Sequence, residues 1–380
     1  MADLFDYLLW RGDLRLDAVP LNPVDTLILS ELSYIDFAGL VSEDFLHPVP
    51  LKVAAEAFLA LPDRDRRVRV KRDADLIAEC ARTARFGQLR LVFYRSELTS
   101  GQSQFAAVTW LLPEGGAIIT YRGTDLTLTG WKEDFHMSFQ PQVPAQEKAL
   151  RYLEAFARVH SGPICLAGHS KGGNLAVYAA ARCQPELQER ICFAHNHDGP
   201  GFHSAMLRDP GYRCILPKLR TFLPQSSVVG MLLEHEEDYA VVDSDQKGLL
   251  QHDGFSWQVL GDRFVHLRQV TRQSQLGDAA LRRWLRAMPV EQRGKFVDAL
   301  FDVITASGAE TLNDLKEDKL KAVGAMVKAM ADLDKETREG LFDLVTLLFR
   351  SGAEVLLEEL QTEGEKKTRE WGRKREKKGK

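Results

Sequence analysis

The fold of this chain is decided by one stretch of its sequence, ICLAGHSKGGNLAVYAAA at residues 164–181. The first four residues form a short apolar run after Gly162-Pro163, and such a run is typical of a buried parallel strand. The small apolar residues that follow Asn174 predict a buried helix. A strand, a glycine-rich turn and a helix, in that order, favour an α/β protein.

The turn between this strand and this helix matches the pattern G-x-S-x-G, at residues 168–172. In a nucleophile elbow the flanking glycines let strand and helix pass close to a serine in a tight turn. The helix then directs free N–H groups and the positive end of its dipole towards that serine. A chance match is the alternative, but the strand before and the helix after argue against it. Ser170 is therefore the candidate nucleophile.

Apolar runs and helical periodicity extend on both sides of this stretch. Together they predict a sheet that is parallel through its centre and flanked by helices. A hairpin is expected at the turn Pro113–Gly116. A basic cluster at residues 64–72 is expected to be a solvated linker. The predicted strands are residues 89–94, 104–112, 117–121, 164–167, 191–194, 219–223, 239–242 and 255–260. The predicted helices are residues 22–39, 51–60, 73–86, 131–139, 145–159, 174–181 and 275–288.

Composition and charge restrict the class of protein. The 380 residues are 44% hydrophobic and 27% charged, which is ordinary for a globular protein with a large core. The net charge of −4 gives no general attraction to nucleic acid, so no nucleic-acid partner is expected. No apolar run reaches 18 residues and the N-terminus lacks a basic segment, so neither a transmembrane span nor a secretory signal is expected, and a cytoplasmic location is predicted.

The five cysteines predict neither a disulfide framework nor a metal cluster, because their number is odd and they are dispersed along the chain. Three of them, Cys165, Cys183 and Cys192, lie in or beside apolar runs and are expected to be reduced thiols in the core. The sequence contains no phosphate-binding glycine loop. No metal and no cofactor is therefore expected.

The composition changes after residue 289. Strand patterns end, and the tetrapeptide Ser-Gly-Ala-Glu at residues 307–310 recurs at 351–354, which predicts two related helix pairs. The last sixteen residues, 365–380, hold nine Lys or Arg and are expected to be disordered. The predicted domains are an α/β domain at 1–288, an all-helical appendage at 289–362 that is a candidate surface for a protein partner, and a basic tail at 363–380.

Five motifs follow one another in the chain. They are Arg122-Gly123-Thr124-Asp125, Gly130-Trp131-Lys132-Glu133-Asp134, residues 168–174, Asp198-Gly199-Pro200-Gly201-Phe202, and Gln251-His252-Asp253 with Ser256-Trp257. This series resembles the Mbeg-like family of bacterial α/β-hydrolases over about residues 5–265, and is more distantly similar to class 3 lipases. The resemblance implies the α/β-hydrolase fold, and it does not imply a substrate.

A serine nucleophile needs a base, and His252 is the first candidate. It lies in a turn after the last central strand, where the fold places its base, and it matches the terminal histidine of the lipase pattern. His266 is the reserve candidate. His235 lies in Glu-His-Glu-Glu at residues 234–237 and is expected to be part of a solvated acidic stretch.

A Ser-His-Asp triad also needs an acidic residue that contacts the histidine. The sequence defines this acid less well than it defines the serine and the histidine. Class 3 lipases carry it in an Asp-x-Val-Pro segment after the strand that corresponds to residues 219–223, but residues 224–229 contain no carboxylate. Asp198, in a glycine-rich turn after the preceding strand, is the first candidate. Asp238 or Asp243, and a chain without an acid, are the alternatives.

An oxyanion hole is expected from the backbone N–H of Lys171, which follows the nucleophile, and that of Thr124, whose hydroxyl could add a donor. The side chain of Lys171 is expected to point to solvent or to pair with a carboxylate. The function that these residues predict is a serine hydrolase acting on an ester of a lipid or another apolar acyl group. The alternatives are an inactive hydrolase fold that serves as a binding module, and a thioesterase or acyltransferase.

Overall fold

A computed structural model of the chain describes residues 2–99, 103–124, 137, 142–227, 229–231 and 233–270. Several sequence predictions lie outside these residues. They are the helix at 275–288, the appendage at 289–362, the tail at 363–380, and all but one residue of the helix at 131–139.

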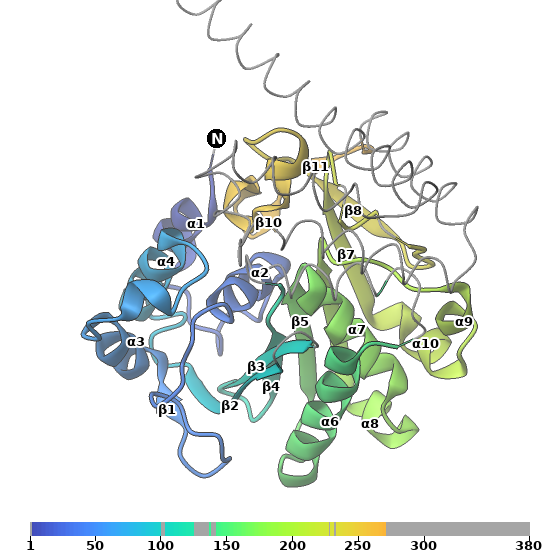
Figure 1. The fold of residues 1–380 in the computed structure, drawn as a ribbon. Helices are drawn as coiled ribbons and strands as arrows, with labels where there is room; N and C mark the ends of the chain where they lie inside the picture. The colour runs from blue at the N-terminus through green and yellow to red at the C-terminus, as the bar shows by residue number, and fades with distance from the viewer. Residues whose placement is uncertain are drawn as a thin grey trace, which may run out of the picture.

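A nine-stranded sheet forms the centre of the molecule, in the order β1-β2-β3-β4-β5-β6-β7-β8-β11 (Figure 1). Strands β4 to β8 are parallel, whereas β1 to β4 and the pair β8–β11 are antiparallel. The sheet is therefore mixed, with a parallel centre as predicted. Short hairpins join β2 to β3 and β3 to β4, and a short connection forces neighbouring strands to be antiparallel. The strands are β1 Val49–Pro50, β2 Arg90–Thr99, β3 Ser103–Leu111, β4 Ala117–Tyr121, β5 Ile164–His169, β6 Ile191–His197, β7 Leu219–Pro224, β8 Tyr239–Val242 and β11 His266–Leu267.

Helices cover both faces of the sheet. One core joins buried residues of the first four helices, and a second core joins residues of the helices that follow β4. Figure 1 shows the first group in blue and the second in green. The first group is α1 Leu4–Arg11, α2 Pro23–Leu32, α3 Leu51–Leu59 and α4 Lys71–Arg82. The second is α6 Pro144–Val159, α7 Lys171–Arg182, α8 Pro185–Arg190, α9 Ser204–Leu207 and α10 Pro210–Ile215.

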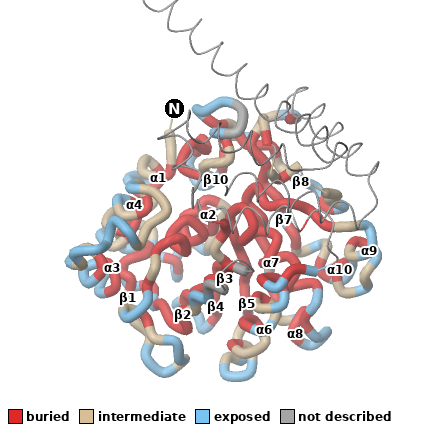
Figure 2. Tube along the Cα trace, viewed as in Figure 1, coloured by how far each residue is buried: buried red, intermediate tan, exposed pale blue. Residues whose placement is uncertain are grey.

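Side chains of the central strands alternate between these two cores. Ile118 of β4 packs in the first core, and its neighbours Ala117 and Ile119 pack in the second. This alternation follows from the two-residue period of a strand. Because both faces are covered, the central strands are buried along most of their length, as Figure 2 shows in red. The molecule thus has three layers, helices, sheet and helices, of the α/β class.

The predicted strand at residues 255–260 is largely wrong. Residues Gly254–Ser256 form the 3-10 helix η4, because the Asp253 side chain accepts a hydrogen bond from the Phe255 N–H and starts a helical turn. Only β9, Val259–Leu260, is a strand, and it pairs with β10, Arg263–Phe264, in a separate two-stranded sheet. Residues 254–264 therefore do not extend the main sheet, and β11 is the strand that pairs with β8.

Two expectations about exposure are also wrong. Within the basic cluster, the Arg69 side chain is only 10% exposed, and its Nη2 atom lies 2.6 Å from Glu31 Oε2. Arg69 was expected in a solvated linker, but the buried carboxylate of Glu31 draws it into the core. Cys192 is exposed, because it lies where the register between β5 and β6 is irregular. All five cysteines are free. No helix in the described part of the chain is long and apolar enough to cross a bilayer.

Candidate active site

Ser170 lies between the end of β5 and the start of α7. Its backbone has φ 56° and ψ −135°, a conformation that side chains rarely adopt, and its N–H donates to the His197 carbonyl at 2.8 Å. The close passage of strand and helix requires glycine, because a Cβ on Gly168 would lie 2.1 Å from the backbone of Gly172. The local structure is the strand, tight turn and helix that the sequence predicted.

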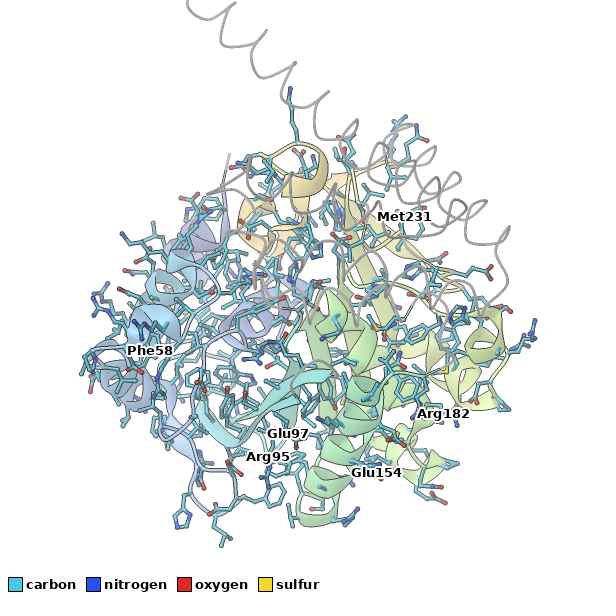
Figure 3. The ribbon with its side chains drawn as sticks, in the orientation of Figure 1. Phe58, Arg95, Glu97, Glu154, Arg182 and Met231 are labelled. Atoms are coloured by element: carbon cyan, nitrogen blue, oxygen red, sulfur yellow. The ribbon has the colours of Figure 1, made fainter. Side chains whose placement is uncertain are left out.

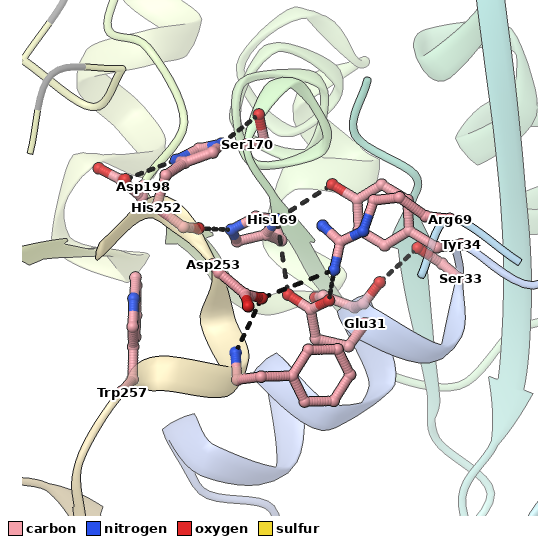
Figure 4. Close-up of polar contacts among 12 residues, drawn as sticks. Glu31, Ser33, Tyr34, Arg69, His169, Ser170, Asp198, His252, Asp253 and Trp257 are labelled. Carbon is pink, nitrogen blue, oxygen red and sulfur yellow. Dashed lines mark hydrogen bonds and ion pairs between the residues drawn. The ribbon is translucent and has the colours of Figure 1, made fainter. Parts of the chain in front are cut away.

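His252 lies beside Ser170. It ends the 3-10 helix η3, Gly248–His252, and its Nε2 atom lies 2.9 Å from Ser170 Oγ (Figure 4). The next residues anchor this segment, since Trp257 Nε1 donates to the Gln251 carbonyl at 2.9 Å. The His252 side chain is 23% exposed, so its ring is accessible from the surface.

Asp198 follows β6 and contacts the other ring nitrogen of His252. Its Oδ2 atom lies 2.6 Å from His252 Nδ1, and its Oδ1 atom accepts from the Ser227 hydroxyl and from the Gly230 N–H, the latter at 3.1 Å. Asp198 is fully buried and has φ 53°. Since a carboxylate only accepts, the Nδ1 proton is on His252, and Nε2 is free to accept from Ser170.

The alternative residues lie elsewhere in the described part of the chain. Asp243 accepts from the N–H of Ser244 at 2.9 Å, and Asp238 is an exposed residue just before β8. His266 is an exposed residue of β11, which pairs with the outer side of β8. The structure therefore brings Ser170, His252 and Asp198 together, and leaves Asp238, Asp243 and His266 apart from them.

The two residues expected at an oxyanion hole flank the nucleophile. Lys171 is the first residue of α7, and Thr124 is a buried residue three positions after β4. A Cβ on Gly123 would lie 3.0 Å from Ser170 Cβ and 2.5 Å from the His169 carbonyl, so this segment passes directly beside Ser170. The Lys171 side chain does not point to solvent, which was one of its two expected positions. It is fully buried, and its Nζ atom donates to the Gln104 carbonyl at 3.1 Å.

His169 contacts the main chain of His252. Its Nε2 atom lies 2.7 Å from the His252 carbonyl, and its Nδ1 atom lies 3.0 Å from the Tyr34 hydroxyl. A carbonyl only accepts, so Nε2 carries the proton and Nδ1 accepts from Tyr34. Burial first, and the neighbouring His252 second, hold the pKa of His169 well below its usual value. His169 is therefore a neutral support for the main chain of His252.

A buried ion pair lies beneath His169 (Figure 4). Glu31 Oε1 is 3.5 Å from His169 Nδ1, and Glu31 Oε2 is 2.6 Å from Arg69 Nη2. Burial raises the pKa of Glu31 to about 8, and the charge of Arg69 opposes this effect. The contacts of Glu31 with Arg69 and His169 were not predictable from the sequence, because the three residues lie in separate segments of the chain.

The acidic stretch at residues 234–237 is not simply solvated, as the sequence analysis expected. The side chain of His235 is 6% exposed and that of Glu237 is 4% exposed, and His235 Nδ1 lies 2.9 Å from Glu237 Oε1. The stretch is drawn inward because hydroxyls from β7 and α10 reach Glu237. Among the described residues, no group of three or more His, Cys, Asp or Glu side chains could hold a metal ion.

Fold and site together define an α/β protein in which a serine, a histidine and an aspartate form one line of hydrogen bonds. The model of the Mbeg1-like family matches residues 80–302, more than half of the chain, so the chain belongs to the Mbeg1-like family. The family resemblance seen in the sequence is thereby confirmed.

Two solved lipases are similar in structure. One is the native Rhizomucor miehei lipase propeptide complex, with a TM-score of 0.36 and 15% identity, and the match covers 57% of this chain and 66% of that one, just under two thirds. The other is the M37 lipase, with a TM-score of 0.36 and 15% identity, covering 54% of this chain and 67% of that one. A search of curated proteins found no match. Similarities of this size do not transfer an activity to the chain.

Proposed function

We propose that this protein is a serine hydrolase of the α/β-hydrolase type that cleaves carboxylic esters through an acyl-enzyme. The observation that carries the proposal is the line of hydrogen bonds from Ser170 through His252 to Asp198, with distances of 2.9 Å and 2.6 Å. A serine hydroxyl is a poor nucleophile without a base, and His252 Nε2 lies at the distance that proton transfer requires.

In the first half-reaction, Ser170 Oγ attacks the ester carbonyl carbon while its proton moves to His252 Nε2. Asp198 accepts the Nδ1–H of His252, holds this tautomer and stabilises the imidazolium that forms. The negative charge on the carbonyl oxygen is stabilised by the backbone N–H groups of Lys171 and Thr124, and one such donor contributes about 2.7–4 kcal/mol in a well-studied hydrolase.

The first half-reaction ends with the opposite proton movement. The tetrahedral intermediate collapses, the C–O bond to the leaving alcohol breaks, and the alcohol takes the proton from His252 Nε2. In the second half-reaction a water molecule gives a proton to Nε2 and attacks the acyl carbon; the bond between this carbon and Ser170 Oγ then breaks, Oγ takes the proton back from Nε2, and the carboxylic acid is released. We assign the acyl group to an apolar or lipid class, in keeping with the distant similarity of the sequence motifs to class 3 lipases.

The alternative of an inactive binding module rested on the lack of a carboxylate at residues 224–229. Asp198 reaches His252 from the preceding strand, and this contact supports the enzyme over the binding module.

The proposal is tested by labelling the folded protein with a fluorophosphonate probe, with a panel of acyl esters and thioesters in parallel. We expect one probe adduct on Ser170, its loss in Ser170→Ala, and unchanged labelling in the control Ser204→Ala, which alters an exposed serine of α9. Intact mass after incubation with the panel identifies the acyl group that remains on Ser170. A folded wild-type protein that takes up neither probe nor acyl group would overturn the proposal, and turnover of thioesters alone would redirect it to a thioesterase.

A further inference from the structure

His235 lies in the connection between β7 and β8, beside the residues that hold Asp198. Its two ring nitrogens both face acceptors, with Nδ1 2.9 Å from Glu237 Oε1 and Nε2 2.6 Å from the Gly230 carbonyl. A neutral imidazole has one N–H and one lone pair, so it can satisfy only one of these contacts. The doubly protonated imidazolium satisfies both.

Glu237 is ionised in this arrangement. The Tyr212 hydroxyl donates to its Oε2 atom at 2.6 Å, and the Thr221 hydroxyl donates to its Oε1 atom at 2.6 Å. Burial by itself raises the pKa of Glu237, but the hydrogen bond and charge of His235, together with the two hydroxyls, outweigh burial and lower it to about 2. A carboxylate without a proton leaves the donor role to His235 Nδ1.

Gly230 connects this pair to the proposed active site. Its carbonyl accepts from His235, and its N–H donates to Asp198 Oδ1 at 3.1 Å. The fit is tight, because a Cβ on Gly230 would lie 2.3 Å from Asp198 Oδ1. A displacement of Gly230 therefore removes one of the donors that hold the carboxylate in place.

The other titratable groups around His235 are acidic or phenolic. Glu234 and Glu236 are its neighbours in the chain, Tyr212 reaches Glu237 from α10, and Tyr239 starts β8. A cavity of about 390 Å³ adjoins the pair; Met231, next to Gly230, lies on its wall near β8 (Figure 3). The lining residues are Leu207, Met231, Glu234, His235, Glu236 and Tyr239.

We propose that His235 is a positioning residue of the active site: as an imidazolium it ties Gly230 to Glu237 and so keeps the Gly230 N–H on Asp198. Its effect on rate rests on the proposed function, whereas its protonation and its contact with Gly230 do not. Loss of the contact between His235 and Gly230 should then lower the rate of ester hydrolysis, because Asp198 loses one of the donors that hold it.

The kinetic test compares kcat and KM of ester hydrolysis in three variants. His235→Gln should lower kcat about tenfold, the size of one hydrogen bond to a charged group, and should leave KM unchanged, because Asp198 is displaced and the substrate is not. Glu237→Gln should lower kcat in the same way, because His235 loses the partner of its Nδ1 atom. The control is His47→Gln, which removes an exposed histidine that pairs with Asp44 at 3.0 Å, and it should leave both constants unchanged.

A spectroscopic test gives a readout that does not need activity. In protein labelled with ¹⁵N-histidine, both ring nitrogens of His235 should carry a proton, and the Nδ1 proton of His252 should change its resonance in His235→Gln. A neutral His235, or an unchanged kcat in His235→Gln while Ser170 still labels, would overturn this inference alone. A protein that never labels but shows the His252 response would overturn the proposed function and leave the inference standing. If His235→Gln does not fold, the wild-type resonances and Glu237→Gln decide the question.

Discussion

Two histidine–carboxylate pairs lie on either side of Gly230, and they differ at one ring nitrogen. In both pairs Nδ1 faces a buried carboxylate, at 2.6 Å in His252–Asp198 and at 2.9 Å in His235–Glu237. The Nε2 atom of His252 faces the Ser170 hydroxyl, which can donate or accept, whereas that of His235 faces a carbonyl, which only accepts. His252 can therefore exist neutral and take a proton, but His235 makes both contacts only when it keeps its proton.

The two pairs also differ in how far the histidine is exposed to solvent. The His252 side chain is 23% exposed, and that of His235 is 6% exposed. A base must reach the substrate, while a residue that fixes a loop works best in the interior. The comparison shows that a carboxylate at Nδ1 does not by itself decide the role of a histidine. The partner of Nε2 decides it.

The largest effect is expected from Asp198→Asn, which changes the carboxylate of the His252–Asp198 pair. The amide would present the wrong tautomer of His252 to Ser170, and the comparable change in a well-studied protease lowers turnover by about 10⁴-fold. Steady-state ester hydrolysis measures the loss. Adding His252→Ala should reduce the rate little further, because members of a triad act as a unit. Near wild-type activity in Asp198→Asn, or a comparable loss in Asp238→Asn or Asp243→Asn, would contradict the assignment of the acid.

The second effect concerns stability and the other pair. The folded pKa of Glu237, about 2, lies below its ordinary value of 4.5, so its ionised form stabilises the fold above pH 4.5, and this contribution disappears as the pH falls towards 2. The shift corresponds to roughly 3 kcal/mol. Thermal unfolding followed from pH 7 to pH 2 should show a weaker acid decline in Glu237→Gln than in the wild type. Glu114→Gln, at an exposed carboxylate in the turn between β3 and β4, is the control and should keep the wild-type decline; an equal decline in all three proteins would show that Glu237 does not contribute.

The third effect concerns Gly230, which contacts both pairs. In Gly230→Ala the new methyl group would meet Asp198 Oδ1 and the Leu223 side chain, each at 2.3 Å, and must push Asp198 away from His252. Misplacement of a catalytic group by about 1 Å lowers a rate by about 10²-fold, and this is the loss of kcat that we expect. The matched control is Gly116→Ala, where a new Cβ meets nothing closer than 3.4 Å. Equal activity in both variants would show that Asp198 does not depend on the position of Gly230.

Local patterns in the sequence predicted much of the fold and the arrangement of the site. The elbow around Ser170 was recognisable because strand, glycines and helix are contiguous, and the strands Ala117–Tyr121 and Tyr239–Val242 were predicted with their observed bounds. His252 and Asp198 were found from motif order and strand order. Contacts between distant segments were not predictable in this way. The run Glu-His-Glu-Glu at 234–237 resembles a solvated stretch until β7 and α10 supply hydroxyls to Glu237, and Arg69 resembles part of a linker until Glu31 lies beside it.

The backbone at Ser170 has a consequence for protein engineering. A non-glycine residue at φ 56° and ψ −135° strains the chain by about 1–3 kcal/mol, and glycine would relieve that strain. Directed evolution for heat resistance alone would therefore favour Ser170→Gly, and the most thermostable clones of such a library would include ones that lack the proposed nucleophile. A library built on this scaffold should keep residue 170 fixed and seek its gains in stability elsewhere.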